Sequence, residues 1–241
     1  MLEFKKVSKN FGTIPALEDV SFKIDDGEFV FITGRSGAGK TTILRLIIRA
    51  TRPSSGEIYL NDEELGAMKN KNVPKLRQRI GAVFQDFKLL PSKTVKENAE
   101  VALAIKGVKE KEWNDRIDHV LNLVGLSERA NLFPSQLSGG ELQRAAIARA
   151  LVINPEIIFA DEPTGNLDWE TTESIIKLLD KINKEGKTVI VTTHNKQIVK
   201  ELGKRVISLK DGKVNSDTGT TTESKTHNKT SAAKSASGGT K

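Results

Sequence analysis

A glycine-rich segment near the start of the chain has the residue types that bind phosphate. It consists of Gly34, Arg35, Ser36, Gly37, Ala38, Gly39, Lys40, Thr41 and Thr42. The first eight residues fit the pattern G-x-x-x-x-G-K-[ST], in which inward-turned backbone N–H groups and a helix N-terminus form an anion nest. Lys40 would reach the β- and γ-phosphates of a nucleoside triphosphate, and the Thr41 hydroxyl would bind Mg²⁺. The segment therefore predicts a triphosphate site with a magnesium ion.

Two carboxylates follow an apolar run much later in the chain. Residues 157–160 read Ile-Ile-Phe-Ala, and Asp161 and Glu162 come next. Ligands bind at the carboxyl ends of parallel strands, so both side chains are placed for a nucleotide site. Beside a phosphate loop, Asp161 would hold the Mg²⁺ shell and Glu162 would act as general base on the attacking water. Many strands end in charged residues, so the pair gains its meaning from the phosphate loop.

A third segment combines a helix start with two glycines. Ser138 and Glu141 form a predicted capping box for the helix that follows. Gly139 and Gly140 weaken its first turn, which makes sense if the backbone must approach a ligand closely. A phosphate is the natural candidate, because a helix N-terminus with free N–H groups is an anion site. The alternative is a well-capped helix without a ligand.

The runs around these segments alternate between strand and helix patterns. Apolar or alternating runs predict strands at 2–7, 20–24, 28–33, 80–84, 157–160 and 189–192. Apolar spacing and composition predict helices at 41–50, 94–106, 110–124, 139–152, 170–185 and 195–203. Buried strands that alternate with helices are typical of an α/β domain with a largely parallel sheet.

The composition limits where the protein works and what it binds. The 241 residues include no Cys and carry a formal net charge of +7, which favours an anionic partner or simply solubility. Only 5% of the residues are aromatic, too few for a surface built on base stacking, so no nucleic acid is expected. No apolar run reaches the roughly 20 residues that span a bilayer, and no signal peptide is visible. We expect a cytoplasmic protein that reaches a membrane only through a partner.

The composition changes near residue 214. Residues 215–241 are mainly Ser, Thr, Lys, Gly and Ala, without a large apolar side chain. Such a segment cannot bury enough surface to offset its ordering entropy, so we expect a disordered tail. Its basic residues would allow weak attraction to anionic lipid, and a flexible tail without a specific role is the alternative.

The three motifs together resemble the ATP-binding cassette (ABC) ATPases, and LSGGE separates that family from other phosphate-loop proteins. The resemblance covers residues 1–214, which it identifies as an ABC nucleotide-binding domain. It implies an α/β phosphate-loop NTPase fold of ABC type, with a RecA-like core, an antiparallel β subdomain and an inserted helical subdomain at about 88–152. It also implies ATPase activity with ATP and Mg²⁺ as cofactors, and a homodimer in which ATP is sandwiched between two copies.

The resemblance assigns roles to further residues. Phe11 stands where an aromatic ring, more often Tyr, stacks on adenine. Gln85 matches a glutamine that touches Mg²⁺ and the attacking water, and His194 matches a histidine that contacts the γ-phosphate. The implied catalytic residues are Glu162, His194 and Gln85, and the implied metal ligands are Thr41, Gln85 and Asp161. The residues implied to bind ATP in trans, from the second copy, are Ser138, Gly139, Gly140, Glu141 and Asp168.

Within the family, FQDFKLLPSKTVKEN and ARALVINPEIIFADEPTGNLD look most like the cassettes of bacterial cell division. This implies an integral membrane partner, a peripheral position on the cytoplasmic face of the membrane, control of cell-wall hydrolysis and further contacts with division-ring proteins. Residues 86–91 would receive a helix of the membrane partner, with apolar contacts from Phe87, Leu89 and Leu90 and a charge from Lys88, unless these are ordinary core residues. Lipoprotein-release and macrolide-export ATPases are the alternative subgroup. Trp169 departs from the family, in which Pro commonly follows NLD, and could alter the start of the next helix.

Overall fold

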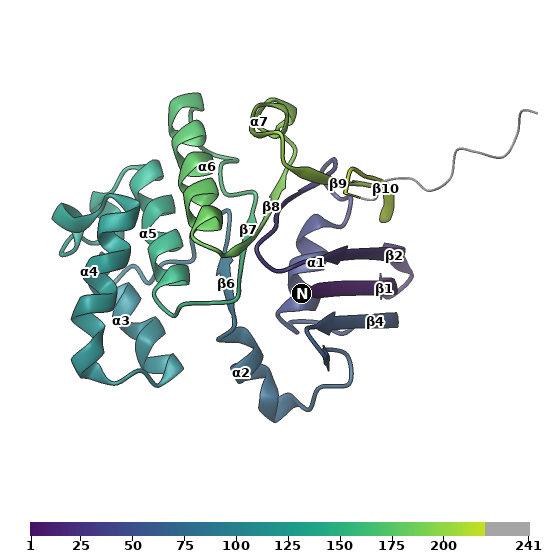
Figure 1. Cartoon of the computed structure of the whole chain (residues 1–241), viewed down its shortest axis with the longest axis horizontal. Helices are drawn as coiled ribbons and strands as arrows, with labels where there is room; N and C mark the ends of the chain where they lie inside the picture. The colour runs from purple at the N-terminus through teal and green to yellow at the C-terminus, as the bar shows by residue number, and fades with distance from the viewer. Residues whose placement is uncertain (220–241) are drawn as a thin grey trace, which may run out of the picture.

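Two β-sheets form the framework of the molecule, and helices cover them (Figure 1). The computed structural model describes residues 1–219, which contain a sheet ordered β2-β1-β4-β5 and a larger sheet ordered β10-β9-β3-β8-β7-β6. The strands are β1 (Leu2–Phe11), β2 (Ile14–Ile24), β3 (Phe29–Thr33), β4 (Ser55–Leu60), β5 (Glu63–Glu64), β6 (Ile80–Val83), β7 (Ile157–Asp161), β8 (Thr188–Thr193), β9 (Arg205–Lys210) and β10 (Lys213–Asp217). The helices are α1 (Lys40–Ile47), α2 (Val73–Arg77), α3 (Val95–Lys106), α4 (Trp113–Val124), α5 (Gly139–Leu151), α6 (Trp169–Lys184) and α7 (Lys196–Leu202). Short 3₁₀ turns lie at Asn70–Asn72, Glu110–Glu112, Ser127–Arg129 and Pro134–Gln136.

The larger sheet is parallel except at one edge. Strands β9, β3, β8, β7 and β6 pair in parallel, and β10 pairs antiparallel with β9. Every residue of β7 and β8 is buried, as expected for parallel strands with both faces covered. The predicted α/β class with a largely parallel sheet is therefore confirmed. Because parallel strands point the same way, their carboxyl ends share one edge of the sheet, and their amino ends share the other.

Two apolar clusters cover the opposite faces of this sheet. Side chains alternate along β3, so Phe29 and Phe31 enter one cluster and Val30 and Ile32 enter the other. The first cluster continues into α3, α4, α5 and α6, and the second into α1 and the smaller, antiparallel sheet. In Figure 1 the helices α3, α4 and α5 stand together at the left and the antiparallel strands lie at the right. No helix within residues 1–219 is both long and apolar enough to cross a membrane.

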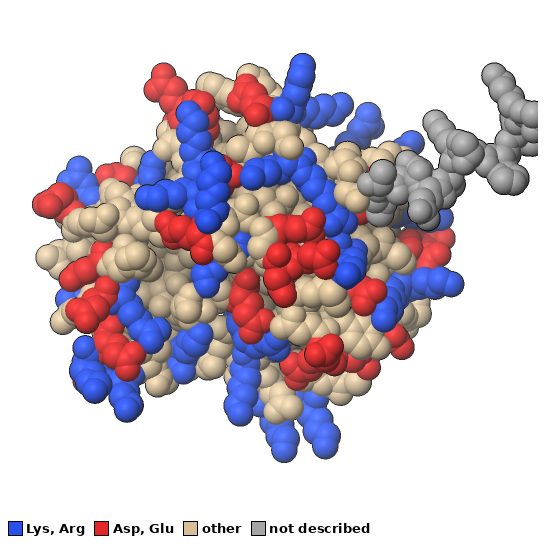
Figure 2. Space-filling view, viewed as in Figure 1, with Lys and Arg blue, Asp and Glu red and all other residues tan. Residues whose placement is uncertain are grey.

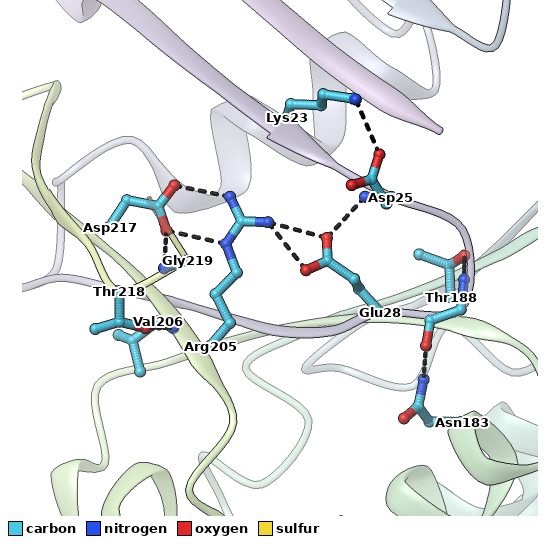
Figure 3. A network of polar contacts seen from close by, with 11 residues as sticks. Lys23, Asp25, Glu28, Asn183, Thr188, Arg205, Val206, Asp217, Thr218 and Gly219 are labelled. Atoms are coloured by element: carbon cyan, nitrogen blue, oxygen red, sulfur yellow. Dashed lines mark hydrogen bonds and ion pairs between the residues drawn. The ribbon is translucent and has the colours of Figure 1, made fainter. Parts of the chain in front are cut away.

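Regular secondary structure continues past residue 214, the boundary that composition predicts. Strand β10 ends at Asp217, so the expected start of a disordered tail at residue 215 is wrong. Arg205 explains the difference, because it donates to both carboxylate oxygens of Asp217, at 2.9 and 2.8 Å, and also to Glu28 (Figure 3). Backbone pairing and an ion pair need no large apolar side chain, which is why composition missed this strand. The remainder of the expected tail, 220–241, lies outside the described residues.

Candidate active site

The phosphate loop joins the carboxyl end of β3 to the start of α1, as its motif requires. Gly39 has φ of 102°, and a Cβ there would lie 2.5 Å from Leu17 Cδ2, so only glycine fits between the loop and β2. A Cβ on Gly34 would lie 2.8 Å from the Leu209 carbonyl oxygen of β9. No side chain caps the N-terminus of α1. The loop is thus pressed against two strands, while the first N–H groups of α1 stay available to an anion.

Lys40 is the buried cation of this loop. Its side chain is only 7% exposed, and Nζ donates to the carbonyl oxygens of Gly34 at 2.7 Å and Arg35 at 3.1 Å. The same Nζ lies 3.1 Å from Glu162 Oε1. Buried charges are stable only when they are paired, so these three oxygens hold the ammonium at the mouth of the loop. Thr41 is exposed and Thr42 half-buried in the first turn of α1.

The two predicted carboxylates lie at the carboxyl edge of the sheet, beside β8. The Thr192 hydroxyl donates to Asp161 Oδ1 at 2.7 Å and accepts from the Glu162 backbone N–H at 2.8 Å. Glu162 has φ of 49°, a left-handed conformation that costs a residue with a side chain about 1–3 kcal/mol. Its Oε2 lies 2.7 Å from Nδ1 of the exposed His194. The strained backbone therefore aims one carboxylate at both Lys40 and His194.

Gln85 follows β6 and reaches the same edge. A Cβ on Gly165 would lie 3.1 Å from Gln85 Nε2, so the amide packs directly against that glycine. Gly165 N–H donates to the Glu162 carbonyl oxygen at 3.1 Å. The structure thus brings Gln85 beside the turn that follows Glu162. Phe11 lies on the β1–β2 hairpin, where 42% of its surface is exposed and Lys9 Nζ sits 5.0 Å from the ring centroid.

The Ser138–Glu141 segment starts α5, and its capping box is confirmed. Glu141 Oε2 accepts from Ser138 N–H at 2.9 Å and from the Ser138 hydroxyl at 2.8 Å, and Arg129 donates to Oε1 at 3.0 Å. These bonds, the Ser138 backbone bond first, lower the pKa of Glu141. The carboxylate is therefore engaged within its own chain. Among residues 1–219, no hydrogen bond or ion pair joins this segment to Lys40.

The two glycines of this segment have a reason inside the chain. A Cβ on Gly140 would lie 2.6 Å from Thr171 Cγ2, and one on Gly139 would lie 3.2 Å from Leu167 Cδ2. The close approach predicted for the glycines is present, but the partner in the described residues is the start of α6. The approach of a phosphate to these glycines stays a prediction, and the contacts with Thr171 and Leu167 are a further reason for glycine at both positions.

Asp168 caps α6. Its carboxylate accepts from the Thr171 hydroxyl at 2.6 Å and from the Thr171 N–H at 2.9 Å, and the first of these bonds is the main cause of its lowered pKa. Trp169 occupies the first position of the helix and is 40% exposed. The departure from Pro leaves the helix start intact, because the Asp168 side chain supplies the cap.

Comparison with known proteins decides the family. Residues 17–165 match the family described as ABC transporter. This chain belongs to the ABC family. It is 47% identical over 213 residues to the cell division ATP-binding protein FtsE of Bacillus subtilis, covering 88% of this chain and 93% of that protein. It is 42% identical over 220 residues to FtsE of Escherichia coli, covering 91% and 99%.

Solved structures agree with the fold. The dimeric bacterial ABC transporter cassette MJ0796 superposes with a TM-score of 0.82 at 42% identity, covering 90% of this chain and 97% of that one. A post-hydrolysis state of MJ0796 bound to ADP and Pi superposes with a TM-score of 0.81. The predicted ABC-type phosphate-loop fold is confirmed, and the cassette is an ATPase that uses ATP with Mg²⁺.

Sequence reasoning missed several residues that shape the cassette's site. Thr192 joins Asp161 and Glu162, and a threonine at the end of a buried strand was its only signal. Leu167 and Thr171 explain the glycines of α5, and nothing in the linear sequence connects them to Gly139 and Gly140. These contacts arise where elements far apart in the chain meet.

Proposed function

We propose that the cassette is the ATPase subunit of a membrane-associated complex that acts in bacterial cell division. The supporting observation is the 42–47% identity to FtsE proteins over 88–91% of this chain. By analogy, the partner is an integral membrane protein resembling FtsX, and the cassette sits peripherally on the cytoplasmic face of the membrane. ATP-driven dimerisation would then be transmitted through this partner to control cell-wall hydrolysis, with division-ring proteins as further contacts.

ATP binding is assigned to the phosphate loop and its surroundings. The free N–H groups of α1 and the Lys40 ammonium suit the charge of a triphosphate, and glycines keep the loop open to it. Phe11 would stack on adenine through its exposed ring. The remaining loop residues that would surround the phosphates are Gly34, Arg35, Ser36, Gly37, Ala38, Gly39, Thr41 and Thr42.

Hydrolysis is assigned to Glu162 as general base on water, with His194 beside it. The 2.7 Å contact between Nδ1 and Oε2 supports this pairing, because it fixes the direction of the carboxylate. The donor set for Mg²⁺ fits a hard cation: the Thr41 hydroxyl, the Gln85 amide oxygen and the carboxylate of Asp161. When bound, the ion would act as a Lewis acid on the phosphoryl oxygens.

The second half of each site is assigned to another copy of the chain. Ser138, Gly139 and Gly140 present the N-terminus of α5, and Asp168 lies at the start of α6 nearby. We place these residues on the γ-phosphate side of the partner's ATP. Glu141 would act mainly by holding Ser138, since its carboxylate already accepts bonds from that residue.

Contact with the membrane partner is assigned to residues 86–91. The 40% exposure of Leu90 supports this assignment, whereas Phe87 and Leu89 pack against the core cluster. A nucleic-acid partner is not proposed. Basic and acidic side chains are interspersed over the face in Figure 2, and Lys and Arg project both at the end where α2 lies and at the opposite end.

Co-purification tests the proposed function. The tagged full chain is extracted from its native cells in mild detergent, and stoichiometric partners are identified by mass spectrometry. We expect a membrane protein together with cell-wall hydrolase factors. Recovery of a lipoprotein-release or drug-export permease would transfer the cassette to the alternative subgroup, and recovery of ribosomes or nucleic acid would overturn both assignments. A Lys40→Ala variant, deficient in ATP binding, is the control for nucleotide-dependent partners.

A further inference from the structure

The segment between β6 and α3 holds two adjacent residues in a strained conformation. Phe87 has φ of 58° and Lys88 has φ of 51°, both in the left-handed region. This conformation is unfavourable for a residue with a side chain and persists only where the surrounding structure enforces it. Two of them in a row point to strong local constraints.

Arg149 of α5 supplies one constraint. Its guanidinium donates to the Lys88 carbonyl oxygen and, at 3.0 Å, to the Phe87 carbonyl oxygen. Burial lowers the pKa of Arg149, and no carboxylate within residues 1–219 forms an ion pair with it. A partly buried cation is thus committed to the two strained carbonyls. The planar fork of Arg suits this task, since it presents parallel donors in a fixed geometry.

Asn98 of α3 supplies a second constraint on the same segment. Its side chain is almost fully buried, and Oδ1 accepts from Leu90 N–H at 2.8 Å. Its Nδ2 donates to the carbonyl oxygens of Leu90 at 3.2 Å, Lys93 at 3.0 Å and Thr94 at 2.9 Å. Hydrogen bonds therefore join residues 87 and 88 to α5 and residues 90, 93 and 94 to Asn98 of α3. The turn that carries Gln85 and Asp86 is closed by a bond from Phe87 N–H to the Phe84 carbonyl oxygen at 3.1 Å and by the Lys88–Asp86 ion pair at 2.6 Å, so its position follows that of residues 87–88.

Gln85 depends on this fastening for its position. Among the described residues its side chain forms no hydrogen bond, and it is placed by its backbone and by packing against Gly165. Gly165 belongs to the turn that follows Glu162. A shift of the Phe87–Lys88 backbone would therefore move the Gln85 amide relative to Glu162.

We propose that Arg149 is a positioning residue for Gln85. By clamping Phe87 and Lys88 to α5, it fixes the Gln85 amide beside the turn of Glu162. Because α5 begins at Ser138, the clamp also couples the position of that helix start to Gln85 in the same chain. The inference rests on the proposed role of Gln85 in hydrolysis.

A double-mutant cycle tests the clamp in the full-length cassette. The variants are Arg149→Lys, Gln85→Ala and their combination, with Arg116→Lys as a matched control, since Arg116 pairs with Glu112 on the exposed side of α4. Lys keeps the charge of Arg149 but cannot bond two carbonyls as a planar fork. Turnover, the ATP concentration for half-maximal activity, the Mg²⁺ dependence and the melting temperature are measured for each.

We expect Arg149→Lys to lower kcat about tenfold, less than the roughly hundredfold loss that a misplacement of about 1 Å can cause, with KM for ATP little changed. In the Gln85→Ala background the same substitution should cause no further loss. An equal loss in both backgrounds would overturn the proposal, because Arg149 would then act on the fold in general. If Gln85→Ala alone leaves kcat unchanged, the role of Gln85 in the proposed function fails, and the clamp fails with it.

Discussion

The amino and carboxyl edges of the parallel sheet differ in how their charged side chains are arranged. At the amino edge, Arg205 pairs with Asp217 and Glu28, and the backbone of Gly27 bonds with Thr188 Oγ1 and Asn183 (Figure 3). At the carboxyl edge, Lys40 and His194 converge on the single carboxylate of Glu162. The ion pairs at the first edge join β9 to β10 and to the loop before β3. Those at the second are held near backbone strain and glycine turns.

Residues at the amino edge contribute mainly to the stability of the fold, whereas those at the carboxyl edge contribute mainly to ATP turnover. Arg205 is bidentate to Asp217 and also pairs with Glu28, so the charged groups at the amino edge are paired with one another. The carboxyl edge contains the left-handed Glu162 and Gly39, and α1 there starts without a side-chain cap. Substitutions at the first edge should therefore change unfolding, and those at the second should change turnover.

The largest expected effect belongs to Glu162→Gln. An amide cannot take a proton from water, so kcat should fall at least about a hundredfold. The melting temperature should stay close to that of the parent, because the amide oxygen still accepts a bond from Lys40. Steady-state ATPase assays and thermal unfolding measure both quantities, with Glu173→Gln on the exposed face of α6 as control. A variant that hydrolyses ATP like the parent would place the base elsewhere.

Arg205→Met should show the reverse pattern. It leaves the carboxylate of Asp217, only 8% exposed, without its main partner, and we expect the free energy of unfolding to fall by about 3 kcal/mol. Turnover at a temperature where the variant is folded should be unchanged. Arg116→Met breaks an exposed pair and should lose less than about 1 kcal/mol. Urea unfolding measures both losses. An equal loss of unfolding free energy in the two variants would mean that the amino edge stabilises the fold no more than an exposed ion pair does.

The contribution of the Arg205–Asp217 pair to stability should depend on pH. Burial alone would raise the pKa of Asp217, but the bonds from Arg205 and Gly219 outweigh it, so the folded value lies below the ordinary 3.8. A carboxylate with a lowered folded pKa stabilises the protein above its unfolded pKa and loses this contribution as the pH falls through the folded pKa. The stability gap between the parent and Arg205→Met should therefore narrow below pH 3.8, as urea unfolding at several pH values would reveal. A constant gap would contradict the assignment.

The smallest expected effect concerns the start of α5. Gly140→Ala would place a methyl group 2.6 Å from Thr171 Cγ2, and we expect a net loss of about 1 kcal/mol. Thr171→Ser removes that methyl and keeps the hydroxyl bond to Asp168, so in this background Gly140→Ala should become neutral or stabilising. Urea unfolding of the parent, the two single variants and the double variant measures whether Gly140→Ala raises or lowers the free energy of unfolding in each background. A loss of the same size in both backgrounds would mean that Thr171 is not the obstacle.

The sequence predicted the elements whose signal is local. The phosphate loop, the capping box at Ser138 and the acidic end of β7 each depend on residues within a few positions of one another. Strand β10 escaped prediction because Asp217 finds Arg205 twelve residues away, and its own residues are polar. The need for glycine at position 140 also could not be predicted in full, because Thr171, which leaves no room for a Cβ there, lies on another helix.

The phosphate loop between a buried strand and a helix could be predicted from the sequence alone, because its glycines, lysine and threonine stand at fixed spacing within one short segment. Only the tertiary structure decided that Glu162 faces both Lys40 and His194, and that Arg149 fastens the segment after Gln85. Those contacts join residues that are tens of positions apart. Their geometry follows from how strands and helices pack around a shared core, which no local pattern encodes.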